Sequence, residues 1–233
     1  MKRSEMKRRG SKIHLFIKTL VAFLCGLLIT GAVLFIPADT LDYPGAWLFM
    51  ALLFTPILIM GVVLLIKNPE LLRKRLEMKE REKEQKSVVA LSGLLLVASF
   101  IVAGLDFRFG WSHVPNAIVI IASVLLFIGY ALYAEVLREN VYLSRVVEVQ
   151  EGQRVIDTGL YGIVRHPMYF AVTLLYLSIP LVLGSWWALL VMSPCLLLLA
   201  ARIRNEEQVL CQGLAGYADY IHRVRYRMIP FVW

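Results

Sequence analysis

The chain has 233 residues, of which 59% are apolar, and a formal net charge of +8 at pH 7. Soluble domains are usually about 45–50% apolar, so this composition excludes an ordinary soluble domain. The basic residues lie between long apolar blocks, which argues against a nucleic-acid-binding protein and favours contact with anionic lipid headgroups.

Six apolar blocks predict an all-α fold, a polytopic membrane helix bundle with about six transmembrane helices. The blocks are 16–36, 45–66, 88–105, 117–137, 167–183 and 186–202. The first four, of about 18–22 residues, are long enough to cross a hydrocarbon core of roughly 30 Å. The last two have about 17 residues each, and only Gly184 and Ser185 separate them, which predicts a short antiparallel helical hairpin.

The charges in the loops predict the orientation of the helices. The N-terminal tail is basic, and its apolar continuation is too long for a typical signal peptide, so we expect a first transmembrane helix. Segment 37–44 has no Lys or Arg, whereas 67–86 is rich in both and is expected to form a solvated helix. Segments 138–166 and 203–233 are again rich in Arg, so both termini are expected to face the cytoplasm.

Three cysteines, Cys25, Cys195 and Cys211, are spread along the chain. No pair has the spacing of metal ligands, and an odd number argues against a disulfide framework. We therefore expect no metal site. The composition divides the chain into residues 1–137, with four apolar blocks and the basic loop, and residues 138–233, with a polar segment, the hairpin and a basic tail.

Polar residues are concentrated at the start of the fifth apolar block and at the end of the sixth. Tyr161, His166 and Tyr169 surround the first position, and Arg202 and Glu206 follow the second. Because the two arms of the hairpin have nearly equal lengths, the chain returns to its starting depth, which brings these groups together. Glu206 shares a helical face with Arg202. Glu207 is rotated by about 100° and is expected to be solvated.

Two local features favour a binding site at the cytoplasmic end of the hairpin. Pro167 suits the first turn of a helix, and it displaces His166 from the helical conformation. The N–H groups of this turn can hold an anionic group. Taken singly, the arginines are explained as topology signals and the tyrosines as interfacial aromatics. Their convergence at one depth favours a cytoplasmic cofactor pocket.

Several separated motifs occur in this part of the chain in a characteristic order. They are Thr158-Gly159-Leu160-Tyr161, Arg165-His166-Pro167-Met168-Tyr169, Arg202 with Glu206-Glu207, Tyr217, Tyr220 and Arg225-Tyr226-Arg227-Met228-Ile229-Pro230. Over residues 130–233 the pattern resembles the isoprenylcysteine carboxyl methyltransferase family, integral membrane enzymes that use S-adenosylmethionine. Two positions depart from the family pattern, Leu160 in place of Pro and Ala171 in place of Gly.

The resemblance implies a role for each matching residue. The implied cofactor-binding residues are Gln153, Arg154, Val155, Ile156, Tyr161, His166, Pro167, Met168, Tyr169 and Glu206. Arg202 matches an arginine that contacts the substrate near the reacting group, so it is the expected catalytic and substrate-binding residue. The implied cofactor is S-adenosylmethionine, and the implied acceptor is lipophilic, in the best-known members a carboxylate.

Three other functions stay open on the sequence alone. A phospholipid or other small-lipid N-methyltransferase requires a base, for which Glu206, Glu207 and His166 are candidates. A membrane reductase with a similar Arg-His-Pro box would bind NADPH. A transporter or assembly factor would place polar groups near the bilayer midplane, whereas these polar groups lie at the expected cytoplasmic ends.

Overall fold

The computed structural model describes residues 2–76, 83–143 and 149–233, and every regular element in these ranges is helical. The predicted all-α membrane helix bundle is confirmed. Five helical stretches are long and apolar enough to cross a membrane: His14–Ala38, Pro44–Lys67, Ser87–Phe109, Asn116–Glu139 and Trp186–Gly213. The fifth predicted block forms a shorter apolar helix of 16 residues. The protein is therefore a multi-pass membrane protein.

Within residues 2–76 and 83–143 the chain forms five helices. They are α1 (Lys2–Ala38), α2 (Pro44–Lys67), α3 (Pro69–Leu76), α4 (Lys83–Phe109) and α5 (Asn116–Glu139). Pro44 begins α2, where its missing N–H leaves no helical hydrogen bond unmade. The helix expected in the basic segment corresponds in part to α3, and residues 77–82 of that segment lie outside the described ranges.

The second half contains the predicted hairpin. Its elements are a 3-10 turn, η1 (Gly159–Gly162), then α6 (Pro167–Val182), α7 (Trp186–Met192), α8 (Cys195–Gly213) and α9 (Tyr217–Arg223). Gly184 turns the chain with a left-handed φ of 81°, and Ser185 caps α7 by accepting a hydrogen bond from Ala188 N at 3.0 Å. The sixth block is not one continuous helix, because Pro194 lacks an N–H and interrupts it between α7 and α8.

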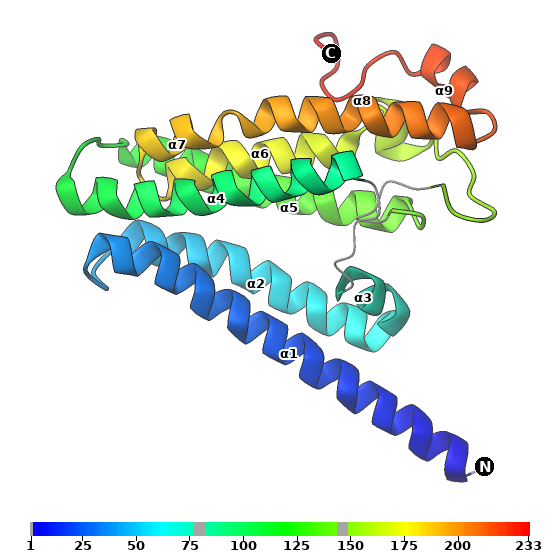
Figure 1. Cartoon of the computed structure of the whole chain (residues 1–233), viewed down its shortest axis with the longest axis horizontal. Coiled ribbons are helices and arrows are strands. Elements are labelled where there is room, and N and C mark those ends of the chain that lie inside the picture. Colours follow the sequence, from blue (N-terminus) through cyan, green and yellow to red (C-terminus); the bar gives the residue numbers. More distant parts are fainter. Residues whose placement is uncertain (1, 77–82, 144–148) are drawn as a thin grey trace.

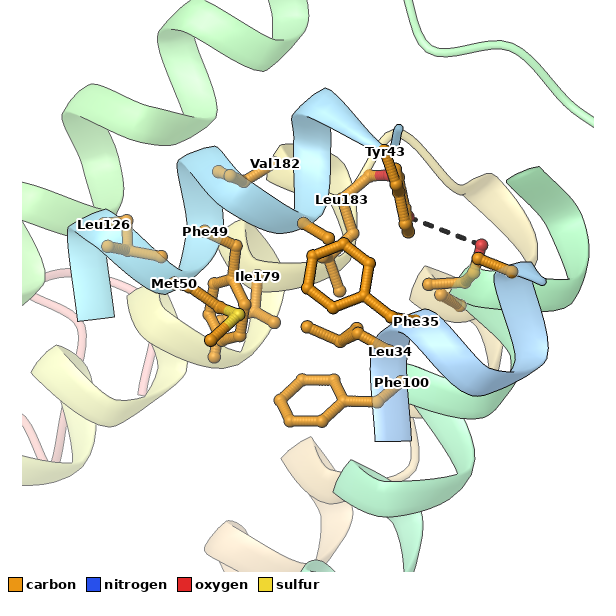
Figure 2. Packing of buried hydrophobic residues seen from close by; sticks show 14 of the residues in the cluster. Leu34, Phe35, Tyr43, Phe49, Met50, Phe100, Leu126, Ile179, Val182 and Leu183 are labelled. Atoms are coloured by element: carbon orange, nitrogen blue, oxygen red, sulfur yellow. Dashed lines mark hydrogen bonds between the residues drawn. The ribbon is translucent and has the colours of Figure 1, made fainter. Parts of the chain in front are cut away.

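The core lies at the end of the bundle opposite the N-terminus. Figure 2 shows side chains of α1, α2, α4, α5 and α6 packed together, among them Leu34, Phe49, Phe100, Leu126 and Ile179. Water is absent from the bilayer, so dense packing and internal hydrogen bonds hold these helices together. This core therefore ties the α1–α2 hairpin to the helices that carry the polar groups.

A buried carboxylate fixes the hairpin turn at the same end. Asp106, in α4, is 1% exposed and accepts hydrogen bonds from the Ser112 backbone N–H at 2.7 Å and the Ser112 hydroxyl at 2.6 Å. It also accepts one from the Ser185 hydroxyl, which lies in the α6–α7 turn. Tyr43 donates a hydrogen bond to the carbonyl of Leu183 at 2.5 Å, beside that turn. The two arms of the hairpin therefore start from a fixed point.

The α1–α2 hairpin diverges from the remaining helices toward the end that holds the N-terminus. Figure 1 shows this divergence and places the N-terminus, α3 and α9 at the same end of the molecule. An apolar cavity of about 710 Å³ lies between α1, α2, α3 and α5, with Phe23, Leu65, Tyr130 and Leu137 in its walls. Its lining suits hydrocarbon chains and not solvent.

Gly104 permits a close contact between α4 and α1. A Cβ atom at this position would lie 2.7 Å from the carbonyl oxygen of Leu34 and 3.1 Å from the backbone nitrogen of Ala38. Small residues allow such backbone approach in membrane proteins. We expect Gly104→Ala to lower the free energy of unfolding by about 1–3 kcal/mol, because the helices must move apart. Thermal unfolding in detergent measures the change.

Gly93 is the matched control on the same helix, because a Cβ atom there meets nothing within 4 Å. Gly93→Ala should leave the melting temperature unchanged or raise it, since Ala has the higher helix propensity. Equal melting temperatures for the two variants would contradict the close packing of α1 on α4.

Candidate active site

The site begins where the chain enters α6. His166 has a φ of −128° and a ψ of 60°, outside the helical region, because the following Pro167 disfavours the helical conformation. Pro167 occupies the first turn of α6, as the sequence predicted. His166 is only 4% exposed, and its Nε2 lies 3.2 Å from Oε1 of Glu207 in α8. The start of one hairpin arm thus contacts the other.

Tyr169 joins α6 to the two charged residues of α8. Its hydroxyl donates a hydrogen bond to the carboxylate of Glu206 and accepts one from Nε of Arg202 at 3.0 Å. The side chain is 3% exposed. The convergence predicted from the equal arm lengths is therefore confirmed for these three residues. One phenol holds a cation and an anion on the same face of α8.

The prediction that Glu207 is solvated is wrong. Its exposed fraction is 7%, and its carboxylate accepts hydrogen bonds from Nε of Arg165 at 2.7 Å and Nε of Arg227 at 2.8 Å. His166 also contacts it. The prediction considered the hairpin alone, whereas the C-terminal tail covers this side of α8. Burying a carboxylate is favourable only when charged partners of this kind surround it.

The tail after α9 returns along the chain and pairs with the start of α6. The hydrogen bonds run from Arg165 Nη1 to the carbonyls of Val224 and Arg225, both at 2.7 Å, from Arg165 N to Tyr226 O at 3.0 Å and from His166 N to Arg227 O at 2.7 Å. Arg165 is 6% exposed, so its role is structural and not that of an interfacial topology signal. The tail therefore holds the start of α6 in place beside the site.

Tyr161, in η1, forms a further part of the wall of the site. Its hydroxyl accepts a hydrogen bond from Nδ2 of Asn140 at 3.0 Å, and its carbonyl accepts one from the hydroxyl of Tyr220 at 2.7 Å. Burial raises the pKa of Tyr161 to about 12, so the phenol stays protonated at neutral pH. This wall is thus made of neutral hydrogen-bonding groups.

These walls enclose a cavity of about 90 Å³. The predicted residues that line it are Gln153, Arg154, Val155, Ile156, Tyr161, His166, Met168, Tyr169, Arg202 and Glu206. Pro167, the remaining predicted residue, is buried in the adjoining first turn of α6. Residues up to 53 positions apart, from Gln153 to Glu206, are therefore brought to one place. Their binding roles stay predictions.

The sequence did not assign a role to several other residues of the lining. These are Asn140, Tyr142, Leu143, Arg165, Leu210, Leu214, Tyr217 and Tyr220. Tyr217 and Tyr220 lie three positions apart, a spacing that places them on one face of α9. Arg227 and Glu207 left no periodic signal, because their contact spans 20 residues and depends on the path of the tail.

Residues 117–214 match the family model of phospholipid methyltransferases. This family of membrane methyltransferases is related to the isoprenylcysteine carboxyl methyltransferases. The match runs from α5 through α8 and includes every residue predicted to bind cofactor or acceptor. A comparison with curated proteins gives no match. The similarity indicates a membrane methyltransferase and gives no support to a reductase or a transporter.

The buried ion pairs of Glu207 yield a stability prediction. Glu207→Gln removes the negative charge and leaves Arg165 buried without its charged partner. We expect a loss of about 3–5 kcal/mol in the free energy of unfolding, as found when one partner of a buried pair is removed. Thermal unfolding of the purified protein in detergent measures this as a large fall in melting temperature.

An exposed ion pair provides the control. Nη1 of Arg223 lies 2.9 Å from Oδ2 of Asp157, with side chains 63% and 37% exposed. Arg223→Ala should change the stability by less than about 1 kcal/mol, because solvent screens the pair. If Glu207→Gln melts at the same temperature as Arg223→Ala, the buried network does not hold the tail.

Proposed function

We propose that the protein transfers a methyl group from S-adenosylmethionine to a lipophilic acceptor at the cytoplasmic surface of the membrane. The observation that supports this most strongly is that one cavity is lined by His166, Tyr169, Arg202 and Glu206 together. That cavity is built largely from the region that matches membrane methyltransferases. The proposal goes beyond this broad class in naming the cofactor, the acceptor and the orientation.

The chemistry of the lining suits S-adenosylmethionine. The carboxylate of Glu206 can accept hydrogen bonds from an amino group or from ribose hydroxyls. The N–H groups at the start of α6 suit a carboxylate. The rings of Tyr161 and Tyr169 can pack on adenine or face the positively charged sulfonium. His166 is held by Glu207 and would orient the cofactor without transferring a proton.

The size of the cavity adds a requirement. Its volume of about 90 Å³ is below the roughly 300 Å³ of small ligand pockets, so the lining side chains must separate to admit a nucleoside. The wall from Gln153 to Ile156 is suited to this movement, because Arg154 is exposed and its neighbours are half-buried. In the wall formed by α6 and α8, by contrast, the hydroxyl of Tyr169 holds Glu206 and Arg202 by hydrogen bonds.

Arg202 would hold the acceptor. S-adenosylmethionine supplies an electrophilic methyl group on a sulfonium, and a carboxylate acceptor is already ionised at neutral pH. A guanidinium can bind a carboxylate through two hydrogen bonds and aim one oxygen at the reaction centre. The hydroxyl of Tyr169 fixes Nε of Arg202, which restricts the orientation of the guanidinium. Alignment of this kind contributes more than a strong base would.

A phospholipid amine is the second candidate acceptor, and the match to phospholipid methyltransferases favours it. An ammonium must lose a proton before or during methyl transfer, so a base is required. The carboxylate of Glu206 is the candidate for this role because it lines the cavity, where the hydrogen bond from Tyr169 fixes its position. The two candidates therefore assign the main acceptor contact to different residues.

The apolar cavity along α5 supports a lipid acceptor of either kind. It extends to Leu137, one turn before Asn140, which lines the polar cavity. An acyl or prenyl chain along α5 would place its polar end near the start of the site. The large apolar surface of such a chain favours its transfer into this lining.

The orientation and the division of labour belong to the same proposal. The end that holds the N-terminus, α3 and α9 carries the basic segments, so the positive-inside rule assigns it to the cytoplasm. Both termini and the site would then be cytoplasmic. Residues 138–233 would form the methyltransferase region, and residues 1–137 would anchor it and contribute the apolar cavity.

Binding of the cofactor is the first test. Calorimetry on the purified protein in detergent should detect saturable binding of S-adenosylmethionine and S-adenosylhomocysteine, because both carry the adenosyl and amino acid groups that the lining suits. NADPH should give no heat of binding. If neither sulfur compound binds, or if NADPH alone binds, the proposed function is wrong.

Arg202→Ala tests the role of the acceptor contact. We expect binding of S-adenosylhomocysteine to change by less than about threefold, while methylation of an S-prenylated cysteine carboxylate falls by about 100-fold or more. Transfer of a labelled methyl group measures the rate. Arg204→Ala, an exposed change on the same helix, is the matched control and should retain full activity.

The same assay with phosphatidylethanolamine vesicles separates the two acceptors. Labelled methyl in the phospholipid, with loss of activity in Glu206→Gln and retention in Arg202→Ala, would establish the amine candidate. A fully active Arg202→Ala enzyme on the carboxylate would remove this residue from the mechanism.

A further inference from the structure

Tyr217 is the first residue of α9 and lines the polar cavity. Its exposed fraction is 4%. Among the side chains that the structure describes, its hydroxyl is the one buried polar atom without a hydrogen-bond partner. Buried polar groups are nearly always paired in folded proteins. Because Tyr217 lines the cavity, a ligand that separates the lining side chains can supply the missing partner.

The position of the Tyr217 ring does not depend on its hydroxyl. Gly216 precedes it with a left-handed φ of 82°, and the backbone N–H of Tyr217 donates to the carbonyl of Leu214 at 3.2 Å. The ring packs on Tyr220 with centroids 5.6 Å apart. Backbone geometry and apolar packing thus hold the phenol, and its hydroxyl contributes no hydrogen bond to the fold.

The hydroxyl of Tyr217 is a donor at physiological pH. Burial, and then the nearby carboxylates of Glu207 and Glu206, raise the pKa of Tyr217 well above its ordinary value. The phenol therefore stays protonated. Its complement in a ligand is a neutral or negatively charged acceptor atom.

The surroundings of Tyr217 indicate which part of a ligand lies there. Leu214, Tyr217, Tyr220 and Val224 form an apolar cluster, against which Val155 and Leu210 pack. Most of this cluster also lines the cavity, so one wall is largely apolar, and of its two hydroxyls only that of Tyr217 has no partner in the fold. A flat heteroaromatic base buries its faces on such a wall and presents acceptor nitrogens at its edge. Charged Arg202 and Glu206, on α8, suit the polar remainder of the molecule.

We propose that the hydroxyl of Tyr217 donates a hydrogen bond to a ring nitrogen of the adenine of S-adenosylmethionine. This inference rests on the proposed function and assigns a binding residue beyond the matched region, which ends at residue 214. Adenine would stack against the apolar cluster and give the buried hydroxyl its partner. Tyr217 would thereby contribute to the selection of adenine.

Tyr220 is the matched control, because it lies on the same helix and in the same apolar cluster. It is 1% exposed, but its hydroxyl already donates to the carbonyl of Tyr161 at 2.7 Å. Tyr220→Phe removes a hydrogen bond of the ligand-free fold and should lower its melting temperature. Tyr217→Phe removes no such bond, so the ligand-free melting temperature should stay the same or rise.

Calorimetry with S-adenosylhomocysteine measures the ligand contact. We expect the dissociation constant of Tyr217→Phe to rise about five- to tenfold, the effect of one lost hydrogen bond. Wild-type protein should show the same loss with one of the 1-, 3- or 7-deaza analogues of S-adenosylhomocysteine, in which a ring nitrogen is replaced by CH. For that analogue, Tyr217→Phe should cause no further loss, because the two changes remove the same interaction.

The outcomes separate this inference from the proposed function. If wild-type protein does not bind S-adenosylhomocysteine, both fail. If it binds and Tyr217→Phe binds equally well, only the role of Tyr217 is overturned. A fall in the ligand-free melting temperature of Tyr217→Phe as large as that of Tyr220→Phe would show a structural partner and overturn it as well. Additive losses with every deaza analogue would exclude the contact with an adenine ring nitrogen.

Discussion

The site depends on the burial of one carboxylate, Glu207, among the positive charges of Arg165 and Arg227. A lone ionised carboxylate would be costly in this setting, because taking a charge out of water is unfavourable by several kcal/mol. The two guanidinium groups at 2.7 and 2.8 Å, with His166 beside them, offset that cost. These contacts connect α8 to the start of α6 and to the C-terminal tail, and so hold two helices of the cavity wall in place. Backbone hydrogen bonds to Arg165 and His166 and the apolar packing of Val224, Met228 and Trp233 hold the tail together with these ion pairs.

The opposite end of the hairpin is fixed independently. Asp106 accepts from Ser112 and Ser185, and Tyr43 donates to Leu183, so the α6–α7 turn is held against α4 and the start of α2. Helices are rigid rods with a fixed rise per residue. A turn that is held at one end therefore determines the depth at which Tyr169 meets Arg202 and Glu206 at the other. The polar groups then adopt a defined geometry at the open end of the hairpin.

The cavity has two kinds of wall, and their difference has chemical meaning. The α6–α8 wall carries charge, and the hydroxyl of Tyr169 restricts that charge to one arrangement. The η1–α9 wall is apolar and aromatic, and its hydroxyls are neutral. Tyr161 and Tyr220 have partners within the fold, whereas the hydroxyl of Tyr217 has none among the described residues. A ligand with a flat base at one end and charged groups at the other would complement both walls.

Hydropathy, read from the sequence, was sufficient to locate the apolar helices, because a bilayer requires continuous apolar helices. The meeting of Tyr169 with Arg202 and Glu206 was also predictable, since two arms of equal length joined by two residues return to the same depth. The burial of Glu207 was not predictable, because Glu206 and Glu207 are the same residue type and only the segment that packs over Glu207 distinguishes them. The path of the tail supplies that neighbour through contacts between residues 20 to 60 positions apart, which leave no local or periodic pattern. The position of Tyr217 at the cavity was not predictable either. It depends on the turn at Gly216 and on packing against Tyr220, and not on its spacing from any other polar residue.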